Sequence, residues 1–399
     1  MRLTTKNTVL AAAVLALSAT TALAGGFALR EQSAEAQGNS FAGVAAGTDG
    51  LSAMFWNPAT LTQHASQGLV TEAVGNLIIP YSKGTGNYGP LSSSGNLGSP
   101  TPVPASYMSY AISDDLVLGM GINAPFGLAT DANTWAGLPH GDKSKVATYD
   151  FSPTVAYKIS DMISVGAGLQ INYMSVDLNN RNPVNGLEFA RFKGDDWGLG
   201  YTFGVLLEPS ESTSIGIGFR SSIKQKLEGT GKNLLAGFAG GDIEAPFKSP
   251  EVVTVGVSQV VSDQLTLKAG VEWTNWSRFK DLTIRRTDTG AIVGQTPENW
   301  KDGWFYSLGA DYDYSDALTL RAGVAYEKSP VPDAWRTVRM PDNDRYWASL
   351  GGSYKLTDRA TASLAYSHVF MKDGGVVQDV TANFKQHLDI LSASLTMDW

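Results

Sequence analysis

The chain has 399 residues, no cysteine and a formal net charge of −8. The absence of cysteine excludes disulfides and thiolate metal sites. The negative charge argues against nucleic acid as a partner, since phosphate binding requires clustered Lys and Arg. Its 43 Gly, 15 Tyr, 15 Phe and 10 Trp stand against a charged fraction of only 17%. Glycine weakens helices and soluble strands, whereas Tyr and Trp concentrate at the two surfaces of a bilayer, so the composition favours a membrane barrel.

The first 24 residues have the pattern of a secretory signal peptide. Arg2 and Lys6 give a positive start, an apolar run covers 9–17, and Ala-Leu-Ala at 22–24 fits the small-x-small cleavage pattern. The apolar run is too short to cross a bilayer, which takes about 20 residues; the alternative is a short buried helix. We expect the mature chain to begin at Gly25 and the protein to be exported.

Residues 25–65, which we call the hatch, lack the alternation of a strand. They are rich in Ala, Gly, Ser and Gln, and their aromatic side chains include Phe27, Phe41, Phe55 and Trp56. The segment is too weakly apolar to fold alone, so it needs a host surface, and a barrel of about fourteen strands has a lumen that side chains alone need not fill. We expect the hatch to plug that lumen; the alternative is a periplasmic tail.

From residue 66 to Trp399 the chain consists of extended segments with period-two alternation. Between Gln264 and Thr274, apolar residues occupy one face of the segment and polar residues or glycine the other. Many segments reach ten residues and close their apolar face with an aromatic, as transmembrane strands do, whereas soluble strands are usually about five or six residues long. Residues 66–399 are therefore predicted to form an outer-membrane β-barrel whose apolar faces contact lipid.

The connections between these segments alternate in length. Short acidic turns, such as Ser262-Asp263 and Ser315-Asp316, alternate with long connections rich in Gly, Pro and Asn. Outer-membrane barrels have short periplasmic turns, longer external loops and an even number of strands. We predict an all-β, closed antiparallel transmembrane barrel of about fourteen strands, a count good to about two. The segments are 66–80, 104–113, 115–124, 146–160, 162–179, 196–208, 212–228, 251–262, 264–280, 300–314, 317–328, 344–356, 359–371 and 386–399.

Several short strings along the mature chain point to a known family. In the hatch they are Gly26-Phe27, Glu31-Gln32-Ser33, Gly38 and Asn57-Pro58-Ala59; in the barrel they are 125–130, 273–279, 329–332 and 341–347. Together they resemble the FadL family, outer-membrane transporters of long-chain fatty acids that have TodX-like importers of aromatic hydrocarbons as relatives. Asn-Pro-Ala alone is a weak signal, but the strings occur in family order across essentially the whole mature chain.

The resemblance implies a route for ligand through a fourteen-stranded barrel plugged by the hatch. Ligand is captured outside by loops, enters an internal pocket, and leaves sideways through a gap made by a kink in the third strand. In this chain the gating residues would be Gly26, Phe27 and the Asn57-Pro58-Ala59 string, with that string beside the gap.

The matching third strand ends in residues 119–127, which include Gly119, Gly121 and Pro125. These residue types weaken or interrupt a strand ladder, which is compatible with a gap near Gly121. The alternative is that they merely end a strand.

The family resemblance also implies an internal pocket that binds carboxylate through basic residues. One of these matches Lys301, which by alternation shares a face with Phe305 and would point into the lumen near Phe27. A buried lysine there needs a bound anion to offset its desolvation; the alternative is that Lys301 pairs with Asp302 or another interior acid. A second family arginine aligns with Ser175, and this departure leaves room for uncharged ligands.

Catalytic and metal chemistry finds no support in the sequence. Ser367-His368 is the only adjacent Ser–His pair, and neighbouring strand residues point to opposite faces, so an interfacial role for this histidine is favoured. No metal-ligand cluster, phosphate-binding loop or cofactor motif is present. We therefore expect no enzyme activity. The four histidines are His64, His140, His368 and His387.

The sequence thus predicts an outer-membrane diffusion channel for hydrophobic small molecules, with long-chain fatty acids as the favoured ligands. Its partners would be that ligand and the lipid and lipopolysaccharide of the outer membrane, and the barrel would be a monomer. Alternatives are an importer of uncharged aromatic hydrocarbons, a general porin with a polar, open lumen, and an adhesin or lipid hydrolase that uses the barrel as an anchor.

Overall fold

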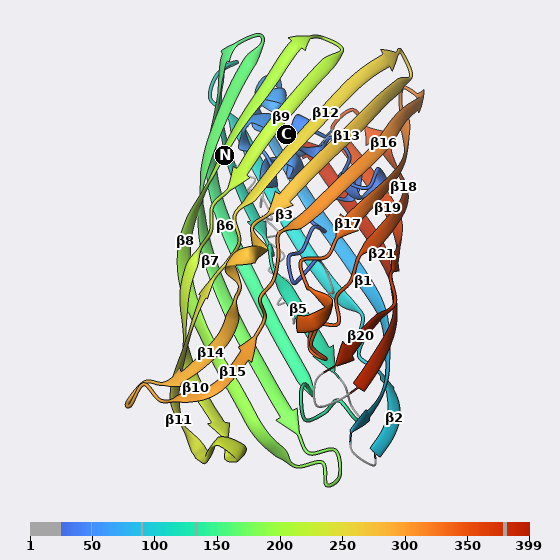
Figure 1. Ribbon diagram of the computed structural model, residues 1–399. Helices are drawn as coiled ribbons and strands as arrows, with labels where there is room; N and C mark the ends of the chain where they lie inside the picture. The colour runs from blue at the N-terminus through green and yellow to red at the C-terminus, as the bar shows by residue number, and fades with distance from the viewer. Residues whose placement is uncertain (1–24, 49, 89–90, 132–134, 378–380) are drawn as a thin grey trace, which may run out of the picture.

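The computed structural model describes residues 25–48, 50–88, 91–131, 135–377 and 381–399 (Figure 1). The expected signal peptide lies outside these residues. No helix in the described part of the chain is long and apolar enough to cross a membrane. The main feature is one antiparallel sheet, in which the first strand, β1, pairs with both β3 and the last strand, β21, so that the sheet closes on itself.

The wall of this barrel has fourteen strands, which confirms the predicted all-β class and strand number. Five wall strands are interrupted and form two elements each (β4/β5, β9/β10, β11/β12, β13/β14 and β15/β16), while β2 and β20 are short additions near the long connections. The bounds are β1 Leu69–Tyr88, β2 Leu91–Asn96, β3 Thr101–Ala111, β4 Leu116–Asn123, β5 Gly127–Asp131, β6 Lys143–Ser160, β7 Ile163–Arg181, β8 Glu188–Ser210, β9 Thr213–Arg220, β10 Lys224–Asn233, β11 Phe238–Lys248, β12 Val252–Ser262, β13 Leu265–Thr274, β14 Asp281–Arg286, β15 Ile292–Pro297, β16 Gly303–Ser315, β17 Leu318–Lys328, β18 Arg345–Thr357, β19 Ala360–Met371, β20 Gly374–Val377 and β21 Thr381–Asp398.

Strands continue further than predicted at the end of the barrel that carries the long connections. β8 begins at Glu188 rather than at 196, and β11, β14 and β15 run through segments expected to be loops. Beyond the bilayer a strand needs no apolar face, so its sequence there lacks the alternation that marks the membrane-spanning part.

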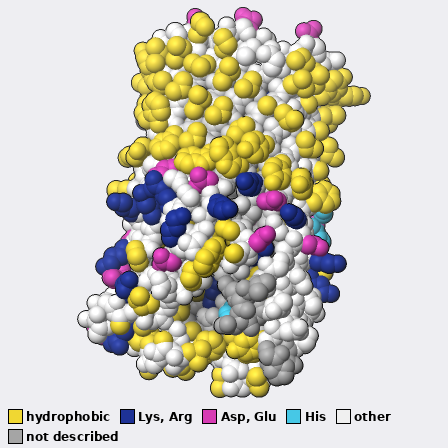
Figure 2. Space-filling model, viewed as in Figure 1, with side chains coloured by type: hydrophobic (Ala, Val, Ile, Leu, Met, Phe, Trp, Pro, Cys, Tyr) yellow, Lys and Arg dark blue, Asp and Glu magenta, His cyan; other side chains and the backbone are white. Residues whose placement is uncertain are grey.

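The outward faces are apolar, as predicted. On four successive wall strands Leu308, Val324, Leu350 and Leu364 are 57–68% exposed, while Ser349, the neighbour of Leu350 in sequence, is buried. Figure 2 shows hydrophobic side chains covering the half of the barrel nearer the short turns, with Lys, Arg, Asp and Glu gathered next to this surface on the side of the long connections. The apolar faces therefore point outward toward lipid, and the polar faces point toward the lumen.

The hatch lies inside the barrel, in the half nearer the short turns (Figure 1). Almost all of its described residues are buried. It is built from short helices because its many Gly, Ser and Asn residues favour turns and caps over long helices. They are α1 Ala34–Gly38, η1 Val44–Ala46, η2 Leu51–Phe55 and η3 Pro58–Gln67; η4 Leu234–Ala236, η5 Trp276–Arg278 and η6 Asp333–Trp335 lie in barrel connections.

Polar pairs and glycines fix the hatch against the inner wall. Ser40 and Ser349 hydroxyls lie 2.7 Å apart, and Asn39 Nδ2 donates to Asp311 at 2.9 Å. A Cβ added at Gly323 of β17 would lie 2.1 Å from the Asn39 carbonyl oxygen, so only glycine lets the hatch backbone approach so closely. Glycine in these wall strands therefore makes room for the hatch.

Candidate ligand route

The third wall strand is interrupted between β4 and β5. β4 ends at Asn123, β5 begins at Gly127, and both pair with β6. On the other side, pairing with β3 stops at Ser106 and Ile122. Proline lacks an N–H and cannot continue a ladder, which accounts for a break around Pro125.

The hatch supplies the backbone pairing that the wall lacks at this break. Residues 27–29 run antiparallel to residues 125–127, with a β-bridge between Ala28 and Phe126. We call this contact the seam. Its flanking hydrogen bonds run from Leu29 N to Pro125 O (2.8 Å) and from Gly127 N to Phe27 O (2.9 Å).

The next residues of the hatch reach the opposite edge of the break. Gln32 Nε2 donates to Ala124 O at 2.8 Å, and Tyr107 OH of β3 donates to Gln32 O at 3.0 Å. Asn76 Nδ2 of β1 donates to Glu31 O at 2.8 Å. Residues 27–32 thus bridge the two edges of the interrupted wall.

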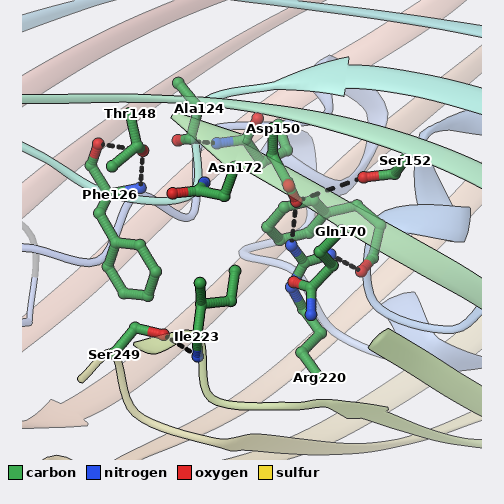
Figure 3. A network of polar contacts seen from close by, with 12 residues as sticks. Ala124, Phe126, Thr148, Asp150, Ser152, Gln170, Asn172, Arg220, Ile223 and Ser249 are labelled. Carbon is green, nitrogen blue, oxygen red and sulfur yellow. Dashed lines mark hydrogen bonds and ion pairs between the residues drawn. The ribbon is translucent and has the colours of Figure 1, made fainter. Parts of the chain in front are cut away.

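A polar network inside the wall supports the seam (Figure 3). Thr148 of β6 accepts a hydrogen bond from Phe126 N at 2.9 Å and donates to Phe126 O at 2.7 Å, and so takes the place of a missing ladder partner. Beside it the buried Asp150 carboxylate pairs with Arg220 at 2.8 Å. Arg220 also donates to Phe55 O of the hatch at 3.0 Å. These contacts tie the backbone of Phe126 and the hatch to the wall strands beside the break.

Aromatic rings surround Phe27 at the inner end of the seam. The Phe27 side chain is 6% exposed, and its neighbours come from four separate parts of the barrel, so no local pattern could have grouped them. We call this group the Phe27 cage. The centroid of the Phe27 ring lies 4.8 Å from that of Trp276, 5.6 Å from Phe247, 5.9 Å from Trp300, 6.0 Å from Phe126 and 6.2 Å from Phe279.

Gly26 fixes the position of Phe27 in the cage. It has a φ of +65°, and an added Cβ would lie 2.6 Å from Trp300, so both conformation and space require glycine here. Its N–H donates to Asp342 at 3.0 Å. Trp300 Nε1 donates to Glu298 at 2.8 Å, and burial raises the pKa of this carboxyl, in the connection between β15 and β16, to about 8. The cage is therefore bordered by a carboxyl group that is mostly neutral at pH 7.

Phe305 points into the lumen, as predicted, but outside the cage. It is 3% exposed, packs against Phe41 and Trp347, and carries the Arg30 guanidinium 3.8 Å above its ring. Arg30 in turn pairs with Glu272 at 2.8 Å. The structure thus separates Phe305 from Phe27, which the sequence had grouped.

Lys301 does not join either group. It is exposed, and β16 begins only at Gly303, so alternation measured from Phe305 does not extend to it. The prediction of a buried Lys301 beside the hatch is therefore wrong. Asp302, its suggested partner, instead accepts hydrogen bonds from Trp273 Nε1 at 3.0 Å and Ser277 N at 3.2 Å.

The Asn57-Pro58-Ala59 string lies away from the seam. Asn57 caps η3, and its Nδ2 donates to Ala45 O at 2.6 Å and to Val205 O of β8 at 3.0 Å. Added Cβ atoms at Gly204 and Gly166 would collide with Asn57 and with the Pro58-Ala59 backbone. The expectation that this string faces the end of the third strand is corrected: it packs against β7 and β8.

Gly121 belongs to an intact part of the third strand. It pairs with Tyr107 of β3 and Ser152 of β6, so the ladder passes through it; pairing with β3 stops at Ile122, and pairing with β6 is interrupted at 124–126. The hatch does approach β4 nearby, because an added Cβ at Gly119 would lie 2.4 Å from Leu61. Of the residues singled out, Pro125 marks the break itself.

A second apolar cluster lies among the long connections. Its members are buried loop and strand-end side chains far apart in sequence. They are Leu97, Trp135, Ala136, Leu138, Val338, Val376, Ala382 and Phe384.

Arg339, next to this cluster, ties the connection between β17 and β18 to β6 and β7. Its guanidinium donates to Ser144 Oγ at 2.8 Å, Lys143 O at 3.1 Å, Asn180 Oδ1 at 2.7 Å and Asn179 O at 2.9 Å. Burial lowers the pKa of Arg339 to about 10, so it remains charged at neutral pH.

Replacing Arg339 by methionine is expected to loosen the connection between β17 and β18. Four acceptors lose their donor, at a cost of about 1–3 kcal/mol for each one left unsatisfied. Amide hydrogen exchange in 335–344 should accelerate at least tenfold, as measured by mass spectrometry on the detergent-solubilised barrel. Arg278→Met, which removes an exposed arginine paired with Glu251, is the control. Equal exchange in both variants would show that Arg339 does not hold the connection.

Comparison with protein families gives one match over nearly the whole chain. The model of the family described as "Outer membrane protein transport protein (OMPP1/FadL/TodX)" matches residues 15–396. Among curated proteins, a 47 kDa outer membrane protein of Pasteurella multocida is 29% identical over 393 residues, and the long-chain fatty acid transport protein of Escherichia coli K12 is 26% identical over 406 residues. In both cases the alignment covers 90% of each chain.

Solved structures share the fold at lower identity. A FadL homologue of Pseudomonas aeruginosa superimposes with a TM-score of 0.85 at 23% identity, covering 94% of this chain and 99% of its own. The Pseudomonas putida toluene transporter TodX superimposes with a TM-score of 0.70 at 18% identity, covering 87% and 94%. This chain therefore shares its fold with both structures.

Proposed function

The chain belongs to the outer-membrane transport proteins of the OMPP1/FadL/TodX family, and from this premise we propose that it conducts long-chain fatty acids by diffusion through the Phe27 cage and out through the seam. That it is an outer-membrane barrel that transports hydrophobic substrates follows from family membership together with the fold. The identity of the ligand and the lateral exit are the proposed part.

The observation that carries the proposal is the position of the Phe27 cage behind the seam. An apolar ligand in the cage would replace Phe27, whose backbone is one strand of the seam. Displacement of Phe27 would then remove the pairing that fills the broken wall and open a sideways path to the lipid. Binding and opening are coupled because the same hatch residues serve both.

Fatty acids are placed first because several relatives carry the name long-chain fatty acid transport protein. Their hydrocarbon chains suit a cage that buries apolar surface at about 25 cal/mol per Å². Two buried arginines could also attract a carboxylate: Arg30 of the hatch, which is paired with Glu272, and Arg345 of β18, which is paired with Asp342.

Uncharged aromatic hydrocarbons are the second candidate. The cage consists of Phe and Trp rings, which stack or meet edge-to-face with an aromatic ligand, and Glu298 at its border offers no positive charge. Lys301, the cation predicted for carboxylate binding, is exposed instead.

Transport into proteoliposomes separates these candidates from each other and from a porin. Vesicles carrying the purified barrel are offered radiolabelled oleate, toluene and glucose in parallel, with empty vesicles as the blank. We expect oleate uptake well above the blank and no glucose uptake, because the hatch fills the lumen. Uptake of toluene alone would assign the second candidate, and glucose entry without oleate or toluene would overturn the proposal.

A further inference from the structure

Three exposed lysines lie on backbone segments that meet at the ends of wall strands, on the side of the long connections. Lys280 O accepts a hydrogen bond from Asn299 N at 2.9 Å, and two residues later Lys301 N donates to Pro330 O at 2.9 Å. Lys328, two residues before Pro330, ends β17. All three side chains are exposed. We call Lys280, Lys301 and Lys328 the lysine patch.

The lysine patch borders the lipid-facing surface. Lys328 is directly opposite Trp304 in the β16–β17 ladder, and opposite residues in an antiparallel pair share a face. Trp304, which is 36% exposed, stacks on Tyr306 at 6.0 Å, and Tyr306 on Tyr326 at 6.5 Å. Such aromatic rows mark the boundary between hydrocarbon and headgroups, so the lysines lie at headgroup level.

The carboxylates next to these lysines in sequence have other partners. Asp281 accepts a hydrogen bond from Thr283 Oγ1, Asp302 accepts from Trp273 Nε1 and Ser277 N, and Glu327 accepts from Trp347 Nε1 at 3.2 Å. Within the described residues, no ion pair involves a lysine of the patch. The patch therefore presents positive charge to solvent.

An apolar hollow of about 680 Å³ lies on the same strands, deeper in the bilayer. Ala269 and Gly270 line the hollow, and larger outward side chains surround them. Val324, on its wall, precedes Lys328 by four residues, or roughly 13 Å at about 3.3 Å per residue. The outward side chains around it are Val255, Val257, Val271, Tyr306, Leu308, Val324, Tyr326 and Tyr346.

We propose that the lysine patch and this hollow form a binding site for a phosphorylated glycolipid of the outer leaflet, of the lipid A type. The long connections are external, so the patch faces the leaflet whose lipids carry sugar phosphates. Lysine ammonium groups pair with phosphate oxygens through charge-assisted hydrogen bonds, and one acyl chain occupies the hollow. The site lies outside the lumen and does not depend on the transported ligand.

Native mass spectrometry of the whole barrel in mild detergent tests this site. The probes are bisphosphoryl lipid A, the same lipid without phosphates, and phosphatidylglycerol, each with EDTA present so that divalent cations cannot bridge. We expect bisphosphoryl lipid A to be retained about tenfold more than either other probe. Lys280→Gln/Lys301→Gln/Lys328→Gln should abolish this preference.

Two further variants separate the charged and apolar parts of the site. Lys158→Gln/Lys355→Gln removes lysines near the short turns, at the opposite end of the barrel, and should leave the preference for bisphosphoryl lipid A intact. Ala269→Trp fills the hollow and should reduce retention of both forms of lipid A severalfold. Equal retention of all three probes, or full retention of bisphosphoryl lipid A by the triple variant, would overturn the proposal. Loss of oleate transport alone would not affect it.

Discussion

Replacement of Phe27 by alanine is expected to raise the affinity of the barrel for toluene at least tenfold. The side chain fills a space enclosed by five aromatic rings, and its removal leaves an apolar cavity of phenyl size. Cavities of this kind stay dry and bind benzene-like molecules. In the unchanged protein, a ligand must first displace Phe27 at a cost of about 3–5 kcal/mol, the usual penalty for emptying a buried Phe site.

Toluene-dependent thermal unfolding measures this effect. Phe27→Ala alone should unfold at a lower temperature than the parent protein, and toluene should restore much of the loss. Phe41→Ala is the matched control: Phe41 is a hatch phenylalanine that is 2% exposed and packs against Trp56 and Trp347, outside the cage. No rescue of Phe27→Ala by toluene, or weaker toluene binding by Phe27→Ala than by the parent, would refute the cage as the ligand site.

A disulfide across the seam is expected to stop transport. Ala28 and Phe126 form an antiparallel β-bridge, and bridged residues lie about 4.5–5.5 Å apart at Cα, within the range that a disulfide spans. The chain has no cysteine of its own, so Ala28→Cys/Phe126→Cys introduces a single pair. Oxidation should lower oleate or toluene flux at least tenfold, because residues 27–29 can no longer leave the wall.

Reduction of the same protein provides the control for the loss of the Phe126 ring, since both states lack it. Dithiothreitol, which reduces the disulfide, should restore the flux of the oxidised variant. A second disulfide, Ser40→Cys/Ser349→Cys, fixes the body of the hatch at a site where the two native hydroxyls lie 2.7 Å apart. If only the first hatch residues move, this disulfide leaves transport intact. Equal flux before and after oxidation of the seam pair would exclude the seam as the exit.

Period-two alternation was sufficient to predict the barrel, because the face to which a strand side chain points depends only on its position along that strand. Leu308 and Leu350 lie outward and Phe305 inward for this reason. The break in the third strand was foreseeable at Pro125, which lacks the donor that a ladder needs. The same rule failed at Lys301, because alternation was extended beyond the residue where β16 begins.

The family resemblance placed Gly26 and Phe27 at the site, but their surroundings came from the structure. Asn57 was expected beside the break and instead lies against β8, because its amide serves as a helix cap and joins two backbone carbonyls. Nothing in the local sequence distinguishes these two positions.

Local sequence therefore determined the membrane barrel, the orientation of its faces and the break at Pro125 in the third strand. Tertiary structure alone decided what fills the lumen and how. Phe27, Phe126, Phe247, Trp276 and Trp300 come from segments up to 273 residues apart, and closure of the sheet brings them to one point. Contacts of this kind depend on the curvature of the whole wall, which no periodicity within one strand encodes.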